Sequence, residues 1–564
     1  MKKRLLFVVL AVMVAVLFVF VSCGDEESTT PATQSTPATE STPATQSTPA
    51  SESTPATQST PASESTPATD TTPAESTEST PAETTEPAPT TYSTKNDVKK
   101  DWNGKTLQVL ACQYSDVGTA AGPWTIPEIK WGENGENLGA SAWGESMVAA
   151  VNDRAAKVKE LYGIDMNWMP SSKDRWKISK DIAEAMTSED THYDIAVLRC
   201  LDAFRFVENN YCYDLGASDY IDFDNDYYSA EAYKMFTLDG HTLFADGSIT
   251  FNNEELAYLL IYNKDMLKRV SPDLNLYDKL ADGSWTYDEF ITVCRLVTKD
   301  MNGNGEWDDN DMYGFGSKNR TRLYRHFGIK GFDVNEETGL YEIAFNKDAT
   351  KLNTVIEKIC GLDSAEWFQD KWGGDWGAGL DQAFAGGRVL FYTDVTEKLN
   401  ELANASLNLG LYFSMGVMPF PKLDANQEFY ATTITNGQGT LACIPKCTSD
   451  RTMSEYFFDV LFWTAEEYVM NTYYEYKMSA FDMETAEEDL QILKDYIWGG
   501  IEFDVASLCN SWTGVFDAVE SGAVAGGTNN FAQVWAENSE AIETRLDEVN
   551  GDFSAYSDTW TPAE

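Results

Sequence analysis

The stretch Leu259-Leu-Ile-Tyr-Asn-Lys-Asp-Met-Leu267 lies near the middle of the chain and begins with a Leu-rich strand that ends at Tyr262. The block Asp282-Gly-Ser-Trp-Thr-Tyr-Asp-Glu-Phe290 follows it and leads into a helix. Short apolar runs bounded by turn-forming residues are typical of buried strands. These two blocks are the most distinctive in the sequence, and the elements around them indicate the class of fold.

Strands and helices alternate on the N-terminal side of these blocks. Apolar residues at helical spacing predict a helix over 147–162 that ends at Gly163, and a second helix is expected over 178–186. Such alternation is typical of an α/β fold with a mainly parallel sheet. Ligands bind at the carboxyl ends of the strands in such sheets, so we expect a site in the loops after Ala111 and Leu198. The predicted strands are Thr106–Ala111, Ile164–Trp168 and Tyr193–Leu198.

The central blocks resemble the middle of the bacterial extracellular solute-binding proteins of ABC importers, family 1, the class that includes maltose-binding protein. Four further blocks follow in the family's order and extend the resemblance over nearly all of the chain beyond residue 95. They are similar to the turn into a central strand, a second crossing between lobes, a strand with its helix, and the closing helices. The blocks are Gln382–Phe391, Gly416–Lys422, Ile444–Lys446 with a helical run to Thr464, and Asp482–Leu490.

The resemblance implies a two-lobed, periplasmic-binding-protein-like α/β fold with a ligand cleft between the lobes and a hinge. By analogy, the first lobe comprises residues 95–215 and 417–468, and the second comprises residues 216–416 and 469–564. The implied function is that of a monomeric solute-binding protein, not an enzyme. It would capture a soluble sugar or oligosaccharide and deliver it to the transmembrane permease of an ABC importer.

The N-terminus has the pattern of an export signal. Lys2, Lys3 and Arg4 precede an unbroken run of 17 apolar residues from Leu5 to Val21. A run of 17 residues could also just span a bilayer. The stretch 20–24 resembles a bacterial lipobox, although Phe20 stands where Leu is usual, and it favours lipidation of Cys23 over a permanent membrane helix. Residues 1–23 are therefore interpreted as a lipoprotein signal, and the protein is expected outside the cytoplasm, anchored to the outer face of the cell membrane.

Residues 24–94 form a low-complexity segment rich in Ser, Thr and Pro. Proline recurs every six residues from Pro31 to Pro73, and the segment has eleven acidic residues and no basic one. It has no apolar periodicity with which to bury surface, so we expect a disordered, extended tether between the anchor and the folded body.

Composition and motifs exclude several classes of function. The formal net charge of −49 repels phosphate backbones, which excludes nucleic acid as a partner. The chain has 3 His, no C-x-x-C pair, no G-x-S-x-G, no H-E-x-x-H and no Walker A motif, so no cofactor for chemistry is expected. The alternatives to a transport receptor are a surface-tethered carbohydrate-active enzyme and a glycan adhesin. The connectivity of the cysteines other than Cys23 cannot be read from the sequence, and several of them are expected to be free, buried thiols.

Candidate ligand-binding residues lie on predicted loops near the cleft. The resemblance implies a hydrogen-bonding carboxylate at Asp202 and stacking aromatic rings at Tyr392 and Trp512. Most Trp side chains pack in a core, and most carboxylates lie on a solvated surface. We therefore selected as candidates only those residues that are predicted to lie on loops at the cleft. The set is Trp124, Arg199, Asp202, Asn253, Glu254, Trp376, Tyr392, Asp394 and Trp512.

The segment 300–311 resembles a calcium-binding loop. Its first six residues read D-x-N-x-N-G, which places oxygen ligands at positions one, three and five and the turn-forming Gly at position six. Position twelve is Asp instead of the usual Glu. We expect either a structural calcium ion or an ordinary loop built on Asx turns. The candidate ligands are Asp300, Asn302, Asn304, Glu306 through its backbone carbonyl, and Asp311.

Overall fold

The computed structural model describes residues 102–112, 126–127, 140, 143–171, 177–188, 190–371, 378–409, 413–434, 438–508 and 513–559. The chain divides between Glu86 and Pro87, and every described residue belongs to the second part. No helix among these residues is long and apolar enough to cross a membrane. The signal, Cys23 and the tether lie outside the described residues.

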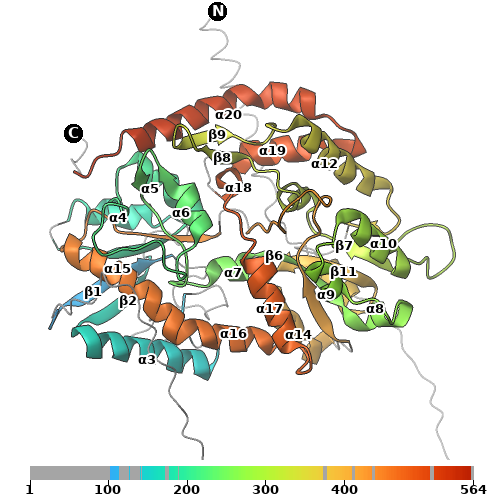
Figure 1. The fold of residues 1–564 in the computed structure, drawn as a ribbon, viewed down its shortest axis with the longest axis horizontal. Coiled ribbons are helices and arrows are strands. Elements are labelled where there is room, and N and C mark those ends of the chain that lie inside the picture. Colours follow the sequence, from blue (N-terminus) through green and yellow to red (C-terminus); the bar gives the residue numbers. More distant parts are fainter. Residues whose placement is uncertain are drawn as a thin grey trace, which may run out of the picture. The chain divides into compact units, whose positions relative to one another are not determined.

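The first sheet has four strands in the order β13-β3-β1-β2 (Figure 1). The strands β1, β2 and β3 are parallel, and β13 pairs antiparallel with β3. The predicted helix is confirmed as α3, Glu145–Tyr162, which ends at Gly163 in the left-handed conformation that glycine tolerates best. The strands are β1 Thr106–Ala111, β2 Asp165–Pro170, β3 Ile195–Arg199 and β13 Thr440–Cys443, and the helices beside them include α4 Ser179–Ala185 and α5 Cys200–Glu208.

The second sheet has five strands in the order β10-β7-β11-β6-β12. The strand β6, Tyr258–Asn263, lies between β11 and β12 and is the predicted Leu-rich strand. Asn263 ends this strand and caps the next helix, because its side chain accepts a hydrogen bond from the Met266 amide. The other strands are β7 Tyr313–Gly316, β10 Phe368–Gln369, β11 Val389–Val395 and β12 Met415–Met418.

Trp285 explains why two of the sequence blocks occur together. Its side chain is fully buried, and its indole N–H donates a 3.0 Å hydrogen bond to the carbonyl of Pro419. The block around Trp285 thus packs on the segment that follows β12. The helices of this region are α8 Lys264–Val270, α9 Leu276–Ala281, α10 Tyr287–Val297, α13 Ala378–Ala385 and α14 Lys398–Leu409.

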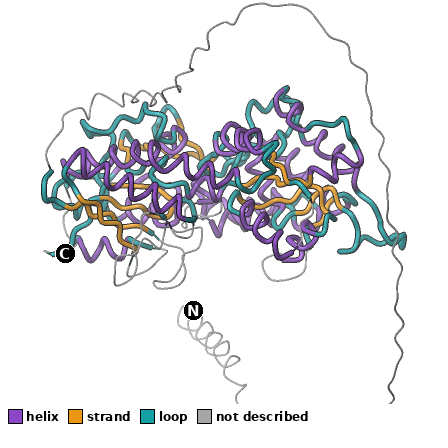
Figure 2. The backbone as a smooth tube through the Cα atoms, turned by 90° about the horizontal axis from the view of Figure 1, so that it is seen from below, coloured by secondary structure: helices purple, strands orange, loops and turns teal. Residues whose placement is uncertain are grey.

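The strands of the two larger sheets form two separate groups in Figure 2, which confirms the α/β class. Two further sheets among the described residues have two strands each, β4-β5 and β8-β9. Further elements pack around them, and the last helix, α20, brings Phe553 against Phe204 of α5 and Tyr341 of β9. These elements are α6 Ala230–Phe236, β4 Thr237–Leu238, β5 His241–Thr242, η2 Arg320–Arg322, α11 Leu323–His326, β8 Phe332–Asn335, β9 Leu340–Ile343, α12 Ala349–Gly361, η3 Leu362–Ser364, α17 Ala486–Ile492, α18 Val505–Leu508, α19 Thr513–Ala523, η7 Ala525–Gly527 and α20 Phe531–Ser554.

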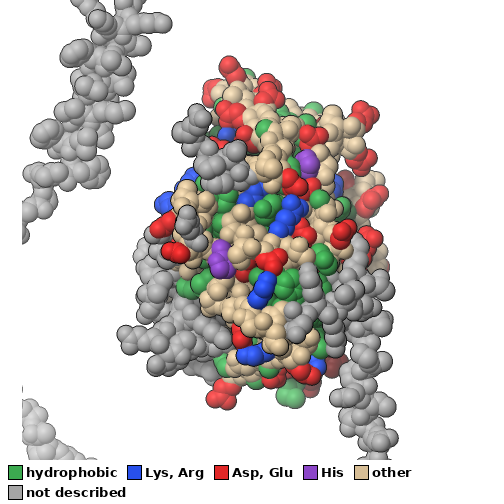
Figure 3. Space-filling view, turned by 90° about the vertical axis from the view of Figure 1, so that its left-hand side faces the viewer, with side chains coloured by type: hydrophobic (Ala, Val, Ile, Leu, Met, Phe, Trp, Pro, Cys, Tyr) green, Lys and Arg blue, Asp and Glu red, His purple; other side chains and the backbone are tan. Residues whose placement is uncertain are grey.

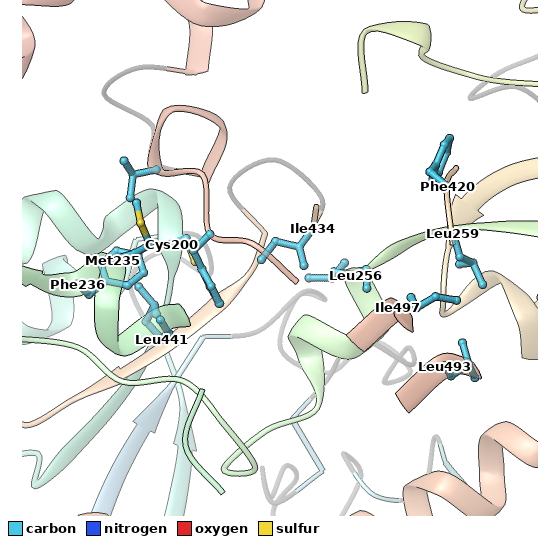
Figure 4. Packing of buried hydrophobic residues seen from close by; sticks show 14 of the residues in the cluster. Cys200, Met235, Phe236, Leu256, Leu259, Phe420, Ile434, Leu441, Leu493 and Ile497 are labelled. Atoms are coloured by element: carbon cyan, nitrogen blue, oxygen red, sulfur yellow. The ribbon is translucent and has the colours of Figure 1, made fainter. Parts of the chain in front are cut away.

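Within the described part of the chain, three segments connect the two larger sheets near the middle of the fold, and we call them the crossing segments. They are residues 252–258 with the short helix α7 Asn252–Leu256, residues 430–434, and the continuous run of α15 Arg451–Ala465, the π-helical η5 Glu466–Met470 and α16 Asn471–Met478. The first two are joined by a hydrogen bond from the Tyr258 amide to the Thr433 carbonyl, 2.9 Å. In Figure 4, Leu256 and Ile434 lie between apolar residues of the two sheets, so one core continues through the crossing.

The crossings lie at different positions from those inferred by analogy. Ala245 pairs with Ala442 beside the first sheet, so the chain leaves that side at 252–258 and not at 216. Because Met415–Met418 is a strand of the second sheet, the chain returns at 430–434 and not at 417. Seven free cysteines are found among the described residues, five of them buried, as expected for unpaired thiols.

Candidate ligand-binding site

A cavity of about 560 Å³ lies beside the crossing segments, and we call it the junction cavity. One part of its wall comes from the loops before α6 and after β5. The other part comes from α7, η5, α16 and the end of η6, Leu493–Trp498. Both η5 and η6 are π-helical, a rare geometry that often occurs at functional sites. The wall consists of Asp226, Tyr227, Tyr228, Ser229, Ala230, Glu231, Asp246, Gly247, Ser248, Glu254, Glu466, Met470, Tyr474, Trp498, Gly499 and Ile501.

Four aromatic residues line the junction cavity in fixed orientations. The hydroxyls of Tyr227 and Tyr228 both donate to Asp459 Oδ1 at 3.0 Å, which holds the two rings in place. Trp498 donates its indole N–H to the Glu254 carbonyl at 3.1 Å. Its ring stacks on Tyr474 with centroids 5.9 Å apart and planes inclined by 24°. Pre-formed aromatic walls of this kind are typical of small-molecule sites.

Two carboxyl groups of the cavity influence one another. Burial raises the pKa of Asp246 to about 7, partly offset by hydrogen bonds from Asn253 and the Gly247 amide. Burial also raises the pKa of Glu254 well above its usual value, and the nearby Asp246 raises it further. Glu254 Oε2 is shielded from solvent and has no hydrogen-bond partner. These carboxyl groups therefore hold protons more readily than ordinary surface acids.

A buried ion pair lies next to the cavity at the crossing. Lys477 of α16 contacts Glu255 of α7, and the Tyr473 hydroxyl donates to the same Glu255 oxygen at 2.6 Å. Glu397 also belongs to this cluster. Its pKa is raised to about 9, mainly by burial and further by repulsion from Glu255. The cluster joins two of the crossing segments through charged groups away from water.

Glu254 is the sequence-predicted ligand residue that lines the junction cavity. Its neighbour Asn253 is buried and binds the first sheet through its side chain. Asn253 Nδ2 donates to the Thr440 carbonyl, and Asn253 Oδ1 accepts from the Thr440 backbone N–H, both at 2.9 Å. Asn253 also reaches Asp246. It therefore positions the wall of the cavity through its contacts with β13.

Arg199 and Asp202 lie at the carboxyl end of β3, as the sequence predicted, but both side chains are fully buried. Asp202 accepts hydrogen bonds from the amide and hydroxyl of Ser179, at 2.8 and 2.9 Å. Asp202 thus fixes the start of α4 against α5 and faces no described cavity.

Tyr392 and Asp394 belong to β11 of the second sheet, away from the junction cavity. The Tyr392 ring is fully buried and packs against Phe384 instead of facing a cavity. Lys318 Nζ lies 2.7 Å from Asp394 Oδ2 and 3.1 Å from Asp381 Oδ1, which closes a local ion-pair network. The remaining predicted residues, Trp124, Trp376 and Trp512, lie outside the described residues.

Most of the cavity wall was missed by sequence reasoning. Tyr227, Tyr228, Asp246, Tyr474 and Trp498 come from four separate segments, and only the tertiary fold brings them together. The available signals were an aromatic pair after Asp226 and a Trp followed by two glycines at 498–500. Neither signal is specific without knowledge of the crossing.

The calcium-like loop is closed by its own hydrogen bonds. Asp300 accepts from the amides of Gly303 and Gly305, which lowers its pKa. Asn302 and Asn304 each accept from the amide two residues ahead, in Asx turns. The buried Asp311 accepts from Met301 and Asp308. Glu306 is exposed, and among the described residues no three His, Cys, Asp or Glu side chains gather as a metal site.

No family model and no curated protein matches the sequence. Solved structures do match. The chain is similar to solute-binding proteins of ABC transporters. An ABC substrate-binding protein from Listeria monocytogenes, in complex with cycloalternan, is 12% identical with a TM-score of 0.42, and the match covers 80% of this chain and 100% of that one.

Two similar structures come from Bifidobacterium longum. A family 1 extracellular solute-binding protein from the subspecies infantis is 14% identical, with a TM-score of 0.45 and coverage of 80% of this chain and 100% of that chain. The galacto-N-biose/lacto-N-biose I-binding protein of an ABC transporter, in complex with lacto-N-biose, is 12% identical. Its TM-score is 0.48, and the match covers 80% of this chain and 98% of that one.

Proposed function

We propose that the protein is a solute-binding protein that captures a sugar or oligosaccharide in the junction cavity and delivers it to the permease of an ABC importer. The observation that carries the proposal is a cavity of about 560 Å³ with four aromatic residues in its wall, placed where the chain crosses between two α/β sheets. Its volume is within the range of small-molecule sites, roughly 300–1,000 Å³.

The wall of the junction cavity suits a saccharide. The apolar face of a sugar ring packs on aromatic side chains such as Trp498, and carboxyl groups such as Asp246 and Glu254 bind its hydroxyls. The ordered sequence blocks, which Trp285 and Pro419 connect in space, support the same class of protein.

Binding is coupled to a hinge motion in this proposal. The two lobes are built on the two sheets, and the three crossing segments form the hinge. A ligand that contacts segments from both sides favours the closed arrangement by as much as its contacts differ between the open and closed states. The permease would then recognise the closed, loaded monomer.

The remaining parts of the chain have supporting roles. Lipidation of Cys23 would anchor the protein to the outer face of the membrane, and residues 24–94 would let the body reach solutes and the permease. A calcium ion in the 300–311 loop would bind Asp300, Asn302, Asn304, Asp311 and the Glu306 carbonyl and stabilise a surface loop.

A second candidate is a surface-tethered carbohydrate-active enzyme. The observation that favours it is the pair Asp246 and Glu254, two electrostatically coupled carboxyl groups in one cavity. Glycoside hydrolysis uses two carboxyl groups of this kind on either side of the scissile bond. A glycan adhesin without an importer partner is the third reading.

Calorimetric titration of the purified protein with neutral oligosaccharides, followed by chromatography of the recovered ligand, tests the proposal. We expect saturable binding and recovery of the ligand at its original length. Shortened products would support the enzyme instead, and absence of binding to every saccharide would contradict the transport function.

A further inference from the structure

The junction cavity has an acidic wall. Five of its lining residues are Asp or Glu, and no Lys or Arg is among the residues that line it. The protein surface is acidic in general, and on the face in Figure 3 acidic side chains are spread around the periphery with fewer basic ones nearer the middle. A concave wall concentrates such a field more than an open surface does.

Two of these acidic residues lie near a basic side chain of the protein. Glu231 forms an ion pair with Lys330, with 2.8 Å between Nζ and Oε1. Lys494 lies close enough to Glu466 to offset part of the burial effect on its pKa. Asp246 has amide and backbone partners, and Glu254 Oε2 has no hydrogen-bond partner.

The aromatic wall already binds one ammonium group of the protein itself. Lys494 Nζ lies 3.5 Å from the centroid of the Tyr474 ring, and Trp498 stacks on that same ring. Cations are attracted to the faces of Trp and Tyr by the ring quadrupole. Aromatic rings next to acidic side chains are therefore a suitable environment for a second cation.

We infer that the ligand of the junction cavity carries an ammonium group, as an amino sugar or an amine-bearing oligosaccharide does. The inference rests on the proposed function, which supplies the saccharide. The ammonium group would lie near Glu254 and Asp246 and favour the ionised form of each, while the sugar ring packs on the aromatic wall. An aliphatic polyamine offers the same ammonium chemistry without a sugar ring.

Calorimetric titration at neutral pH with three probes tests the inference. The probes are chitotriose, which has three amines, its fully N-acetylated form, which has none, and spermidine. We expect chitotriose to bind at least about tenfold more tightly than the acetylated form, the scale of one charge-assisted contact.

Variants of the cavity acids make the test specific. We expect Glu254→Gln to weaken chitotriose at least about tenfold and to bring the two trisaccharides closer in affinity. Asp226→Asn, at an exposed position of the wall, tests the same charge effect without risk to the core. Glu540→Gln, on the exposed face of α20, is the matched control and should bind like the wild type.

Each outcome decides between the two proposals. Equal affinity for both trisaccharides, or binding of a neutral saccharide in preference to chitotriose, overturns the inference and leaves the proposed function intact. Binding of spermidine with no binding of any saccharide supports the ammonium site but contradicts the proposed function. Wild-type affinity for chitotriose in both cavity variants, or no binding of any probe, overturns the inference.

Discussion

Lys477 Nζ lies 2.5 Å from Glu255 Oε1, and both side chains are buried at the crossing between the two sheets. Burial is the largest influence on both groups: it raises the pKa of Glu255 and lowers the pKa of Lys477, although each partner favours the charged form of the other. The ion pair therefore contributes less to folding than its short contact suggests. Its geometric effect is to hold α16 against α7.

Removing one partner of this pair should be strongly destabilising. We predict that Lys477→Met lowers the free energy of unfolding by about 3–5 kcal/mol, because it leaves the Glu255 charge buried without compensation. Urea denaturation measures this change. The double variant Glu255→Gln with Lys477→Met should recover much of the loss. Additive effects of the two substitutions would show that the pair is not energetically coupled.

His326 should make the protein sensitive to acid. Its ring stacks on Phe420 with centroids 3.6 Å apart, and its Nδ1–H donates to the Ala431 carbonyl at 3.0 Å. Burial lowers the pKa of His326 to about 3, so the folded state binds fewer protons than the unfolded state between about pH 6.5 and 3. The free energy of unfolding should fall as pH drops through this window.

Replacement of His326 checks this pH dependence. His326→Asn keeps a side-chain donor but does not titrate, so the stability advantage of the wild type should shrink by up to about 1.4 kcal/mol per pH unit below pH 6.5. His192→Asn, at a half-buried position, is the comparison variant. Parallel stability curves for the wild type and His326→Asn would contradict the assignment.

The loop 300–311 predicts an effect of calcium on stability. If the loop binds calcium, the melting temperature should rise with added calcium and fall with chelator. Binding to the native state alone would raise the free energy of unfolding by about 2.7 kcal/mol at a calcium concentration a hundredfold above the dissociation constant. Asp300→Ala should remove the difference, whereas Asp309→Ala, an exposed neighbour in the same loop, should keep it. Identical melting curves with calcium and chelator would assign the loop to Asx turns alone.

Cys23 should control where the protein is found in the cell. We predict that Cys23→Ala releases the protein into the medium or leaves it as an uncleaved precursor, because the lipid anchor cannot form. Fractionation followed by mass measurement of the N-terminus checks the outcome. A processed variant that stays in the membrane fraction would show that another segment anchors the protein.

Local patterns predicted the fold well where each element carries its own signal. The Leu-rich strand that was expected to end at Tyr262 is β6, Tyr258–Asn263, because a short apolar run bounded by turn-forming residues is a local signal. The α/β class followed from the alternation before residue 200. The positions of the crossings were not readable, because the pairing of Ala245 with Ala442 depends on contacts distant in sequence.

The candidate site was less predictable than the fold. Asp202 follows β3 as expected, yet it is bound by the helix start at Ser179. Tyr392 was expected after a strand but lies within β11, where its ring packs on Phe384. Burial of this kind depends on side chains from other segments. Glu254 was found because it precedes a recognisable strand, whereas Trp498 and Tyr474 come from helices that only the folded chain brings to the cavity.

The most direct test of the central claim is the affinity of the best-binding oligosaccharide for a protein whose junction cavity is obstructed. Ala230 lines the cavity and is exposed, so Ala230→Trp should fill the entrance without disturbing the core, whereas Ala541→Trp places the same side chain on the exposed face of α20. We predict that calorimetric titration shows at least about tenfold weaker binding, about 1.4 kcal/mol, for Ala230→Trp and wild-type binding for Ala541→Trp. Wild-type affinity in a folded Ala230→Trp variant would contradict the claim that the ligand binds in this cavity.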